Sequence, residues 1–151
     1  MEKIVIIDDE KNIAELCKRL LQEEGHEPLV AFTGEEGLAL IEREKPRVVV
    51  LDLMLPTMDG MEVLGKITSI DPAIQVIMIT AFASVQSAVA SMKRGACDYI
   101  SKPFMPDELK IVVQKAIENA RLKEALSYKQ EKESKAFSIE SIIGISPKIM
   151  R

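Results

Sequence analysis

The stretch Val48-Val49-Val50-Leu51-Asp52 places four apolar residues, three of them β-branched, directly before a carboxylate. An uninterrupted apolar run has no polar face, which is typical of a strand buried on both sides of a parallel sheet. Pro56 and the pair Asp59-Gly60 follow, and residues of these types break a strand. Asp52 is therefore predicted at the carboxyl end of a central strand, where open α/β sheets bind their ligands.

Four other apolar stretches predict strands, and helical periodicity fills the gaps between them. The strands are expected at 3–7, 27–31, 74–79 (ending at Thr80) and 97–101. Pro28 assigns the second of these to a sheet edge, because proline donates no hydrogen bond to a neighbouring strand. Five helices are expected: from Ile13 to a cap at Gly25, from a Thr33/Glu36 capping box to Glu44, from Gly60 to Asp71, from Ser84 to Arg94, and from Pro106 onward. The fourth helix has Val85, Ala88, Val89 and Met92 on one face and ends at Gly95.

The alternation of five strands with five helices predicts right-handed βαβ units and a parallel sheet covered on both faces. The number of strands matches the flavodoxin-like strand order 2-1-3-4-5, which places strands 1 and 3 side by side. The predicted fold class is therefore α/β: a flavodoxin-like (βα)5 domain with a five-stranded parallel sheet and an extended C-terminal helix.

The composition excludes several classes of function. The net charge of −4 does not favour a nucleic-acid surface, and no apolar run approaches the roughly 18–20 residues that span a membrane. With one histidine and no Cys/His cluster, a zinc site is not expected. Cys17 and Cys97 are interpreted as buried small hydrophobic residues of a reducing compartment, and the N-terminus does not resemble a signal peptide, so a cytoplasmic location is expected.

Five chemically distinctive residues fall at strand ends that share one edge of the predicted sheet: Asp8, Asp9, Asp52, Thr80 and Lys102. Carboxylates held close together repel one another until a proton or a cation binds, and Mg²⁺ prefers oxygen ligands. Asp52 would act as the nucleophile of phosphoryl transfer, while Lys102 and Thr80 bind phosphoryl oxygens. Ala81 is small enough to leave space for a phosphate beside Thr80.

Each of these residues also has an ordinary structural explanation. Asp9 could simply cap the first helix, and a lysine before a proline is more often solvated than catalytic. Their arrival from four strands at one edge favours a functional site over these separate explanations.

The motifs that carry this chemistry resemble those of response-regulator receiver domains over residues 1–121. They are Asp8-Asp9-Glu10, Leu51 to Pro56 with Asp59-Gly60, Thr80-Ala81, and Gly95 to Phe104. The resemblance implies that Asp52 accepts a phosphoryl group from the phosphohistidine of a sensor histidine kinase. It implies that Asp9 and Asp52 bind Mg²⁺ directly, Asp8 through water and Met54 through its backbone carbonyl. It also implies a cis peptide bond at Lys102-Pro103.

The same resemblance identifies Tyr99 as a switch residue whose ring rotates inward when Thr80 moves toward the phosphoryl group. The surface of the fourth helix, fifth strand and fifth helix would then change. The alternative for Tyr99 is a half-buried aromatic residue of an edge strand, with no role in switching.

The C-terminal part of the chain predicts more than one domain. Beyond the apolar stripe that ends at Ala120, Leu122, Ala125 and Leu126 lie among charged residues without a clean heptad. Residues 122–138 are interpreted either as a solvated helical extension that frays near Lys129 or as a linker helix that forms a homodimer. Residues 141–150 resemble the start of the AAA+ ATPase domain of NtrC-type sigma-54-dependent activators, so residues 139–151 are assigned to a truncated second domain.

Two alternatives belong to other functional classes. An aspartyl-phosphate hydrolase needs a second aspartate two residues after the first, where this chain has Met54. The chain is therefore expected to be a phosphoacceptor and not an enzyme, with slow autodephosphorylation that Met54 and Phe82 shield further. A stand-alone receiver that signals only by binding is disfavoured by the extended fifth helix and the isoleucine-rich C-terminal residues.

Overall fold

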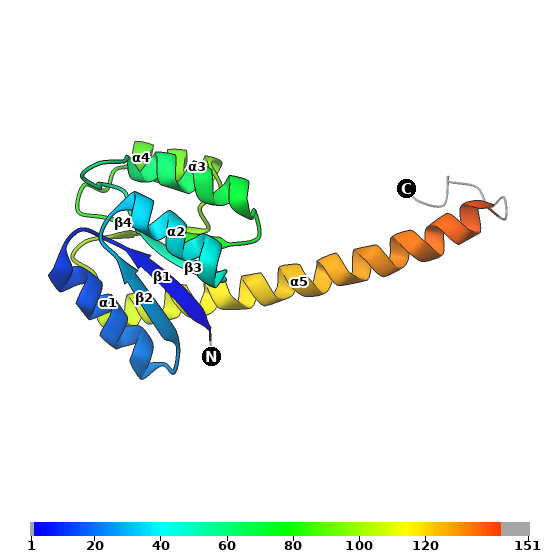
Figure 1. The fold of residues 1–151 in the computed structure, drawn as a ribbon, viewed down its shortest axis with the longest axis horizontal. Coiled ribbons are helices and arrows are strands. Elements are labelled where there is room, and N and C mark those ends of the chain that lie inside the picture. Colours follow the sequence, from blue (N-terminus) through cyan, green and yellow to red (C-terminus); the bar gives the residue numbers. More distant parts are fainter. Residues whose placement is uncertain (1, 143–151) are drawn as a thin grey trace. The chain divides into compact units, whose positions relative to one another are not determined.

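The computed structural model describes residues 2–142, and the side chains of residues 2–126. The elements are β1 (Lys3–Ile7), α1 (Lys11–Glu23), β2 (Glu27–Ala31), α2 (Gly34–Glu44), β3 (Val48–Asp52), α3 (Gly60–Ile70), β4 (Gln75–Thr80), α4 (Val85–Lys93), β5 (Asp98–Ser101) and α5 (Pro106–Ile142). The strands form one parallel sheet in the order β2-β1-β3-β4-β5 (Figure 1). The predicted flavodoxin-like fold class and strand order are confirmed.

β3 lies at the centre of the sheet, and all five of its residues are buried. Its alternate side chains enter two separate apolar cores, as the two-residue period of a strand requires. Val48 and Val50 join a core that includes residues of α1 and α5, while Val49 and Leu51 join a core that includes residues of α2 and α3. The sheet is thus covered on both faces (Figure 1), which explains the uninterrupted apolar run.

Two predicted helix ends close with glycines in the left-handed conformation. Gly25 has φ +82°, and the next amide, that of His26, donates to the carbonyl of Leu21 at 3.1 Å. Gly95 has φ +107° and ends α4 in the same way. A residue with a side chain is strained at this φ, so glycine reports the helix end directly in the sequence.

α4 turns most of its apolar face toward solvent. Val85 is 81% exposed, and Val89 and Met92 are nearly half exposed, while Ser91 is buried. The Ser91 hydroxyl donates to the sulfur of Met61 at 3.5 Å, which joins α4 to α3. The shared face predicted for these apolar residues is real, but it does not face the core.

α5 continues to Ile142, past Lys129, where one interpretation placed the fraying of the helix. The chain divides into two units, Met1–Ala120 and Arg121–Arg151. The predicted start of an ATPase domain at 139–151 lies mostly outside the described residues. Within the described part, no helix is both long and apolar enough to cross a membrane.

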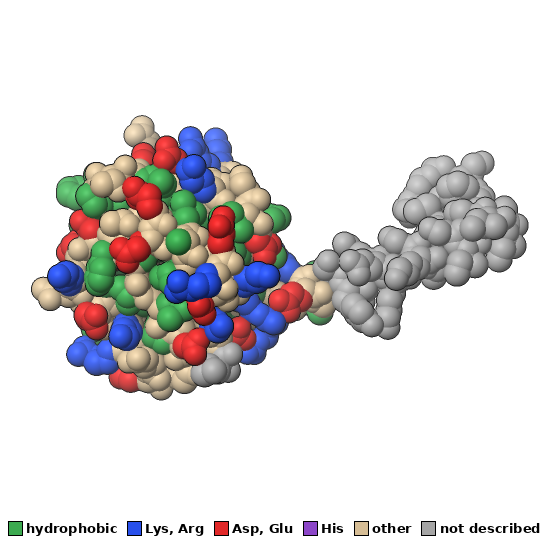
Figure 2. All heavy atoms as spheres, in the orientation of Figure 1, with side chains coloured by type: hydrophobic (Ala, Val, Ile, Leu, Met, Phe, Trp, Pro, Cys, Tyr) green, Lys and Arg blue, Asp and Glu red, His purple; other side chains and the backbone are tan. Residues whose placement is uncertain are grey.

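Acidic and basic side chains are interspersed on the face of residues 2–126 seen in Figure 2, without a large field of one sign. This mixture agrees with the small net charge of −4. A nucleic-acid interface usually gathers positive charge on one face, and the visible face has no such concentration.

Gly60 brings the first turn of α3 against the end of β3. Its amide donates to the carbonyl of Leu53 at 3.0 Å. A Cβ atom at this position would lie 2.5 Å from the Leu53 carbonyl oxygen and 2.6 Å from that of Asp52. Because these neighbours are backbone atoms, they cannot move aside without shifting the strand end that carries Asp52.

We expect Gly60→Ala to lower the free energy of unfolding by about 1–3 kcal/mol, since the added methyl group overlaps backbone. Gly65→Ala is the matched control, because it lies in the same helix and a Cβ there meets nothing within 4 Å. That control should raise the free energy of unfolding by about 0.5–1 kcal/mol through helix propensity. Urea denaturation measures both, and equal effects of the two substitutions would contradict the close approach.

Candidate functional site

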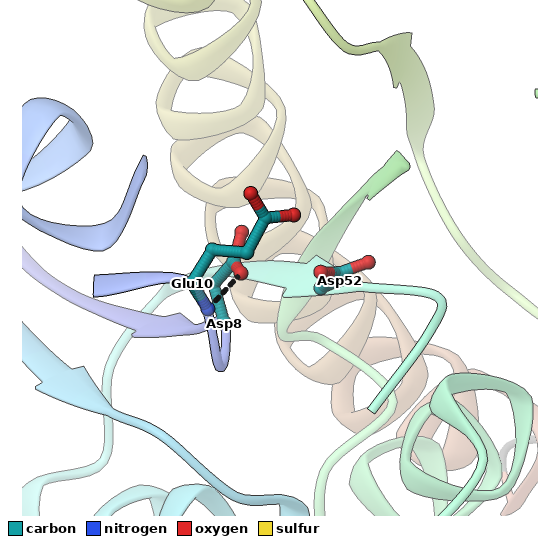
Figure 3. Close-up of side chains that lie close together, drawn as sticks. All are labelled: Asp8, Glu10 and Asp52. Atoms are coloured by element: carbon teal, nitrogen blue, oxygen red, sulfur yellow. Dashed lines mark hydrogen bonds between the residues drawn. The ribbon is translucent and has the colours of Figure 1, made fainter. Parts of the chain in front are cut away.

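Two buried aspartates lie side by side where β1 and β3 end. Asp8 follows β1 and Asp52 is the last residue of β3, and these strands pair through Ile7 and Leu51. Asp8 is 1% exposed and Asp52 is 3% exposed. Carboxylate oxygens of Asp8, Glu10 and Asp52 all lie within 4.8 Å of one another, and Figure 3 shows the three side chains gathered there.

Each buried aspartate is fixed by the backbone amide two residues later. The Glu10 amide donates to Oδ1 of Asp8, and the Met54 amide donates to Oδ1 of Asp52, each at 2.9 Å. This local bond is characteristic of aspartate in a turn, because its short side chain reaches the backbone two positions on. One oxygen of each carboxylate is thus held, and Oδ2 of each is left for a cation.

Lys102 supplies that cation in the structure. Its Nζ lies 2.9 Å from Oδ2 of Asp8 and 3.0 Å from Oδ2 of Asp52, and its side chain is only 6% exposed. Burial by itself lowers the pKa of Lys102, but the contacts with the two carboxylates outweigh it and hold this pKa above its ordinary value. The ammonium group therefore stays charged.

Asp8 is the acid whose ionisation the site opposes most clearly. The pKa of Asp8 is raised from 3.8 to about 6: burial is the largest cause and the charge of Asp52 adds to it, while Lys102 and the Glu10 amide act in the opposite direction. Among the described residues, Oδ2 of Asp8 is contacted by the Lys102 ammonium group at 2.9 Å and has no other polar partner. A metal ion could therefore replace the ammonium group as the counter-charge of this buried oxygen.

A cavity of about 190 Å³ opens beside Asp52. Its lining comprises Asp9, Glu10, Asp52, Met54, Thr80, Ala81, Phe82 and Lys102. Thr80 is fully buried, and its Oγ1 accepts from the Phe82 amide at 3.1 Å, which leaves the hydroxyl proton to donate. A water molecule occupies about 30 Å³ in the liquid, so the cavity has room for a phosphoryl group.

The structure brings most of the predicted site residues to this cavity. Asp8 is not among the residues that line the cavity but contacts Lys102, which is, and the peptide bond between Lys102 and Pro103 is cis. Asp9 is exposed and does not cap α1, whose N-cap is Glu10, so that structural explanation of Asp9 is wrong. Direct binding of a metal ion by Asp9 and by the Met54 carbonyl stays a prediction.

Sequence reasoning missed Glu10 as a site residue. Its Oε1 lies 3.1 Å from Nζ of Lys102, and its side chain is 57% exposed. The sequence shows the acid next to Asp9, but a side chain at the start of a helix can turn in several directions. Only the position of Lys102, ninety-two residues away, shows which one it takes.

Tyr99 on β5 is half-buried, and its hydroxyl is hydrogen bonded to Oγ of Ser87 in the first turn of α4. Ser87 also forms a reciprocal capping box with Ser84, the N-cap of α4. Tyr99 is therefore connected to the start of the helix whose apolar face is exposed.

The donor set fits Mg²⁺. All candidate ligand atoms are hard oxygens, several are carboxylate oxygens, and the partly open cavity leaves room for the waters that Mg²⁺ retains. No cysteine or histidine is among the residues that line the cavity, which disfavours zinc.

Residues 4–126 match the family described as the response regulator receiver domain. The chain belongs to this family. The receiver is 33% identical to the regulatory protein AtoC of Escherichia coli (strain K12) over 150 residues, which are 99% of this chain and 32% of AtoC.

Solved structures agree with this assignment. NtrX from Brucella abortus is 38% identical with a TM-score of 0.80, over 83% of this chain and 29% of NtrX. A CheY-like receiver from Methanospirillum hungatei JF-1 is 38% identical with a TM-score of 0.74, over 80% of this chain and 98% of that one. The chain thus spans only about a third of the length of AtoC and of NtrX.

We expect Mg²⁺ to bind more weakly as the pH falls through about 6, because a proton on Asp8 then competes with the metal ion. Displacing one proton raises the apparent dissociation constant by up to about tenfold per pH unit below that pKa. Titration calorimetry between neutral and mildly acidic pH measures this dependence. Asp8→Asn should remove most of it, and an affinity that is constant across the range would contradict the assignment.

Proposed function

We propose that Asp52 accepts a phosphoryl group from the phosphohistidine of a sensor histidine kinase, and that this receiver acts as a phosphorylation switch. The observation that carries the proposal is the position of Oδ2 of Asp52. It faces Lys102 at 3.0 Å and borders a cavity that Thr80 and Ala81 also line. Nucleophile, fixed positive charge and hydroxyl donor thus surround one space of phosphoryl size.

The side chains divide the work of the transfer. A carboxylate oxygen of Asp52 forms the new P–O bond as the P–N bond to histidine breaks, and the imidazole leaves with that electron pair. Lys102 and the Thr80 hydroxyl then bind oxygens of the transferred group. Mg²⁺, held by Asp9, Asp52 and the Met54 carbonyl with Asp8 acting through water, would neutralise the negative charge that develops.

A hydrolase of the aspartyl-phosphate type remains the less favoured alternative. Such an enzyme needs a general acid beside the nucleophile, and Met54 stands there with 54% of its surface exposed. Phe82, which is 70% exposed, borders the same cavity. We therefore propose slow loss of the phosphoryl group and no turnover of an external substrate.

We expect Asp52→Asn to reduce labelling by acetyl phosphate and Mg²⁺ by at least about 100-fold, because an amide is a poor nucleophile. Asp107→Asn, an exposed aspartate in the first turn of α5, should label like the original chain. Intact-protein mass spectrometry measures the label. Undiminished labelling of folded Asp52→Asn would overturn the proposal, and loss of label within seconds from the original chain would favour the hydrolase.

We propose that Tyr99 carries the signal from the site to α4. The Lys102 amide donates to the carbonyl of Thr80 at 2.8 Å, so a shift of Thr80 toward the phosphoryl group acts directly on the end of β5. Inward rotation of Tyr99 would break its hydrogen bond to Ser87. Ser87, a member of the α4 capping box, would then lose its contact with β5. A tyrosine without a switching role would keep that bond.

We propose a homodimer that uses the surface of α4, β5 and α5, the linker helix, or both. Val85, Val89 and Met92 on α4 are exposed, as are Leu122 and Leu126 on α5. Exposed apolar side chains that gather on one helix face favour a protein partner.

The output is proposed to be a sigma-54-dependent AAA+ activator acting in the cytoplasm. The match to AtoC extends over 99% of the chain, past the end of the receiver family match at residue 126. A receiver with a different output, or none, is the alternative.

One experiment tests the switch and the dimer together. The chain is compared with and without Mg²⁺ and the phosphoryl mimic beryllofluoride. We expect Tyr99 to become more buried when the mimic is present. We also expect the particle mass to be twice the chain mass of 16.8 kDa in at least one of these two states. Light scattering measures the mass, and NMR of labelled tyrosine measures the ring. A monomer in both states would contradict the proposed homodimer. An unchanged exposure of the Tyr99 ring would contradict its proposed role as a switch.

A further inference from the structure

Glu10 differs from the other two acids that contact Lys102. The carboxylates of Asp8 and Asp52 are 2% and 4% exposed, whereas that of Glu10 is 57% exposed. The buried pair is fixed through Oδ1 by backbone amides. Glu10 has a longer side chain, and no hydrogen bond other than that from Lys102 is recorded for its carboxylate in the described residues. It is the acid of the three that is free to move.

Lys102 occupies the position where a metal ion would approach the buried pair. Its Nζ lies within 3.1 Å of one oxygen from each of the three acids. A metal ion that binds Asp52 at about 2 Å would lie within a few ångströms of this ammonium group. Two cations beside the same oxygens repel each other, so binding of the metal ion favours a position of Lys102 farther from the buried pair.

We propose that Glu10 is a positioning residue that keeps Lys102 in the site when Mg²⁺ takes over Asp8 and Asp52. This inference rests on the proposed function of the site. Glu10 and Lys102 line the same cavity as Thr80, so an ammonium group that stays paired with Glu10 stays where a phosphoryl oxygen arrives. Lys102 can thus leave Asp8 and Asp52 while its ammonium group stays paired with the carboxylate of Glu10.

The backbone of Glu10 gives this role a fixed pivot. Its amide donates to Oδ1 of Asp8 at 2.9 Å, so the start of the Glu10 side chain is held beside the buried pair (Figure 3). The carboxylate can swing while the backbone stays in place. Reach is therefore the property that matters, because the side chain must follow Lys102 as it leaves Asp8.

The test separates the effect of the length of the Glu10 side chain from the effect of its charge. Glu10→Gln removes the charge, and Glu10→Asp keeps it but shortens the side chain by one methylene group. We expect both to weaken Mg²⁺ binding in calorimetry by roughly threefold to tenfold, the scale of one charge-assisted contact. Glu15→Gln, an exposed acid of α1, is the matched control and should bind as the original chain does.

A second background separates positioning from direct metal binding. In Lys102→Ala, the substitution Glu10→Gln should change Mg²⁺ affinity less than twofold, because the group that Glu10 positions is gone. An equal loss in both backgrounds, or a Glu10→Asp variant that binds like the original chain, would overturn the proposal. Because these titrations contain no phosphodonor, the proposal can fail while Asp52 still labels; absence of Mg²⁺ binding to the original chain would count against the proposed function itself.

Discussion

The structure depends on two carboxylates that are buried side by side with the ammonium group of Lys102 between them. The apolar run of β3 and the matching run of β1 place Asp52 and Asp8 at adjacent strand ends, where water cannot screen their repulsion. Lys102 arrives from the end of β5, two strands away from β3, and its long side chain spans the end of β4. Because the Lys102 side chain crosses the end of β4, Thr80 at that end lies within the site.

This arrangement makes the occupancy of one position matter to several elements. A proton, an ammonium group or a divalent ion can each balance the charges of Asp8 and Asp52, and in this structure the ammonium group of Lys102 does so. Lys102 is tied through its amide to the Thr80 carbonyl, and β4 pairs with β5 through Thr80 and Ser101. In the proposed switch, a change of partner at the acids would therefore act on β5, the strand that carries Tyr99.

The sequence could predict what is set by local rules. Buried strands, their polar ends, and the glycines that close α1 and α4 each require particular residue types, so Asp8, Asp52, Gly25 and Gly95 were placed correctly. The direction of an exposed side chain follows no such rule. Glu10 points to Lys102 because β5 ends nearby, and α4 buries Ser91 because of its packing against α3. Both facts depend on contacts between residues distant in the chain.

α4 is the element on which these effects converge. Fully burying a valine or methionine side chain is worth about 1.5–3 kcal/mol, and Val85 and Met92, which are 81% and 48% exposed, leave part of that free energy unused. The helix is instead held at its first turn by the capping box of Ser84 and Ser87 and by Tyr99, contacts of about 1 kcal/mol each. The free energy lost with one such contact is therefore similar in size to the free energy gained when a partner covers one of these apolar side chains. In the proposed switch, a small change behind Tyr99 would be enough to alter the conformations of α4 that are available to a partner.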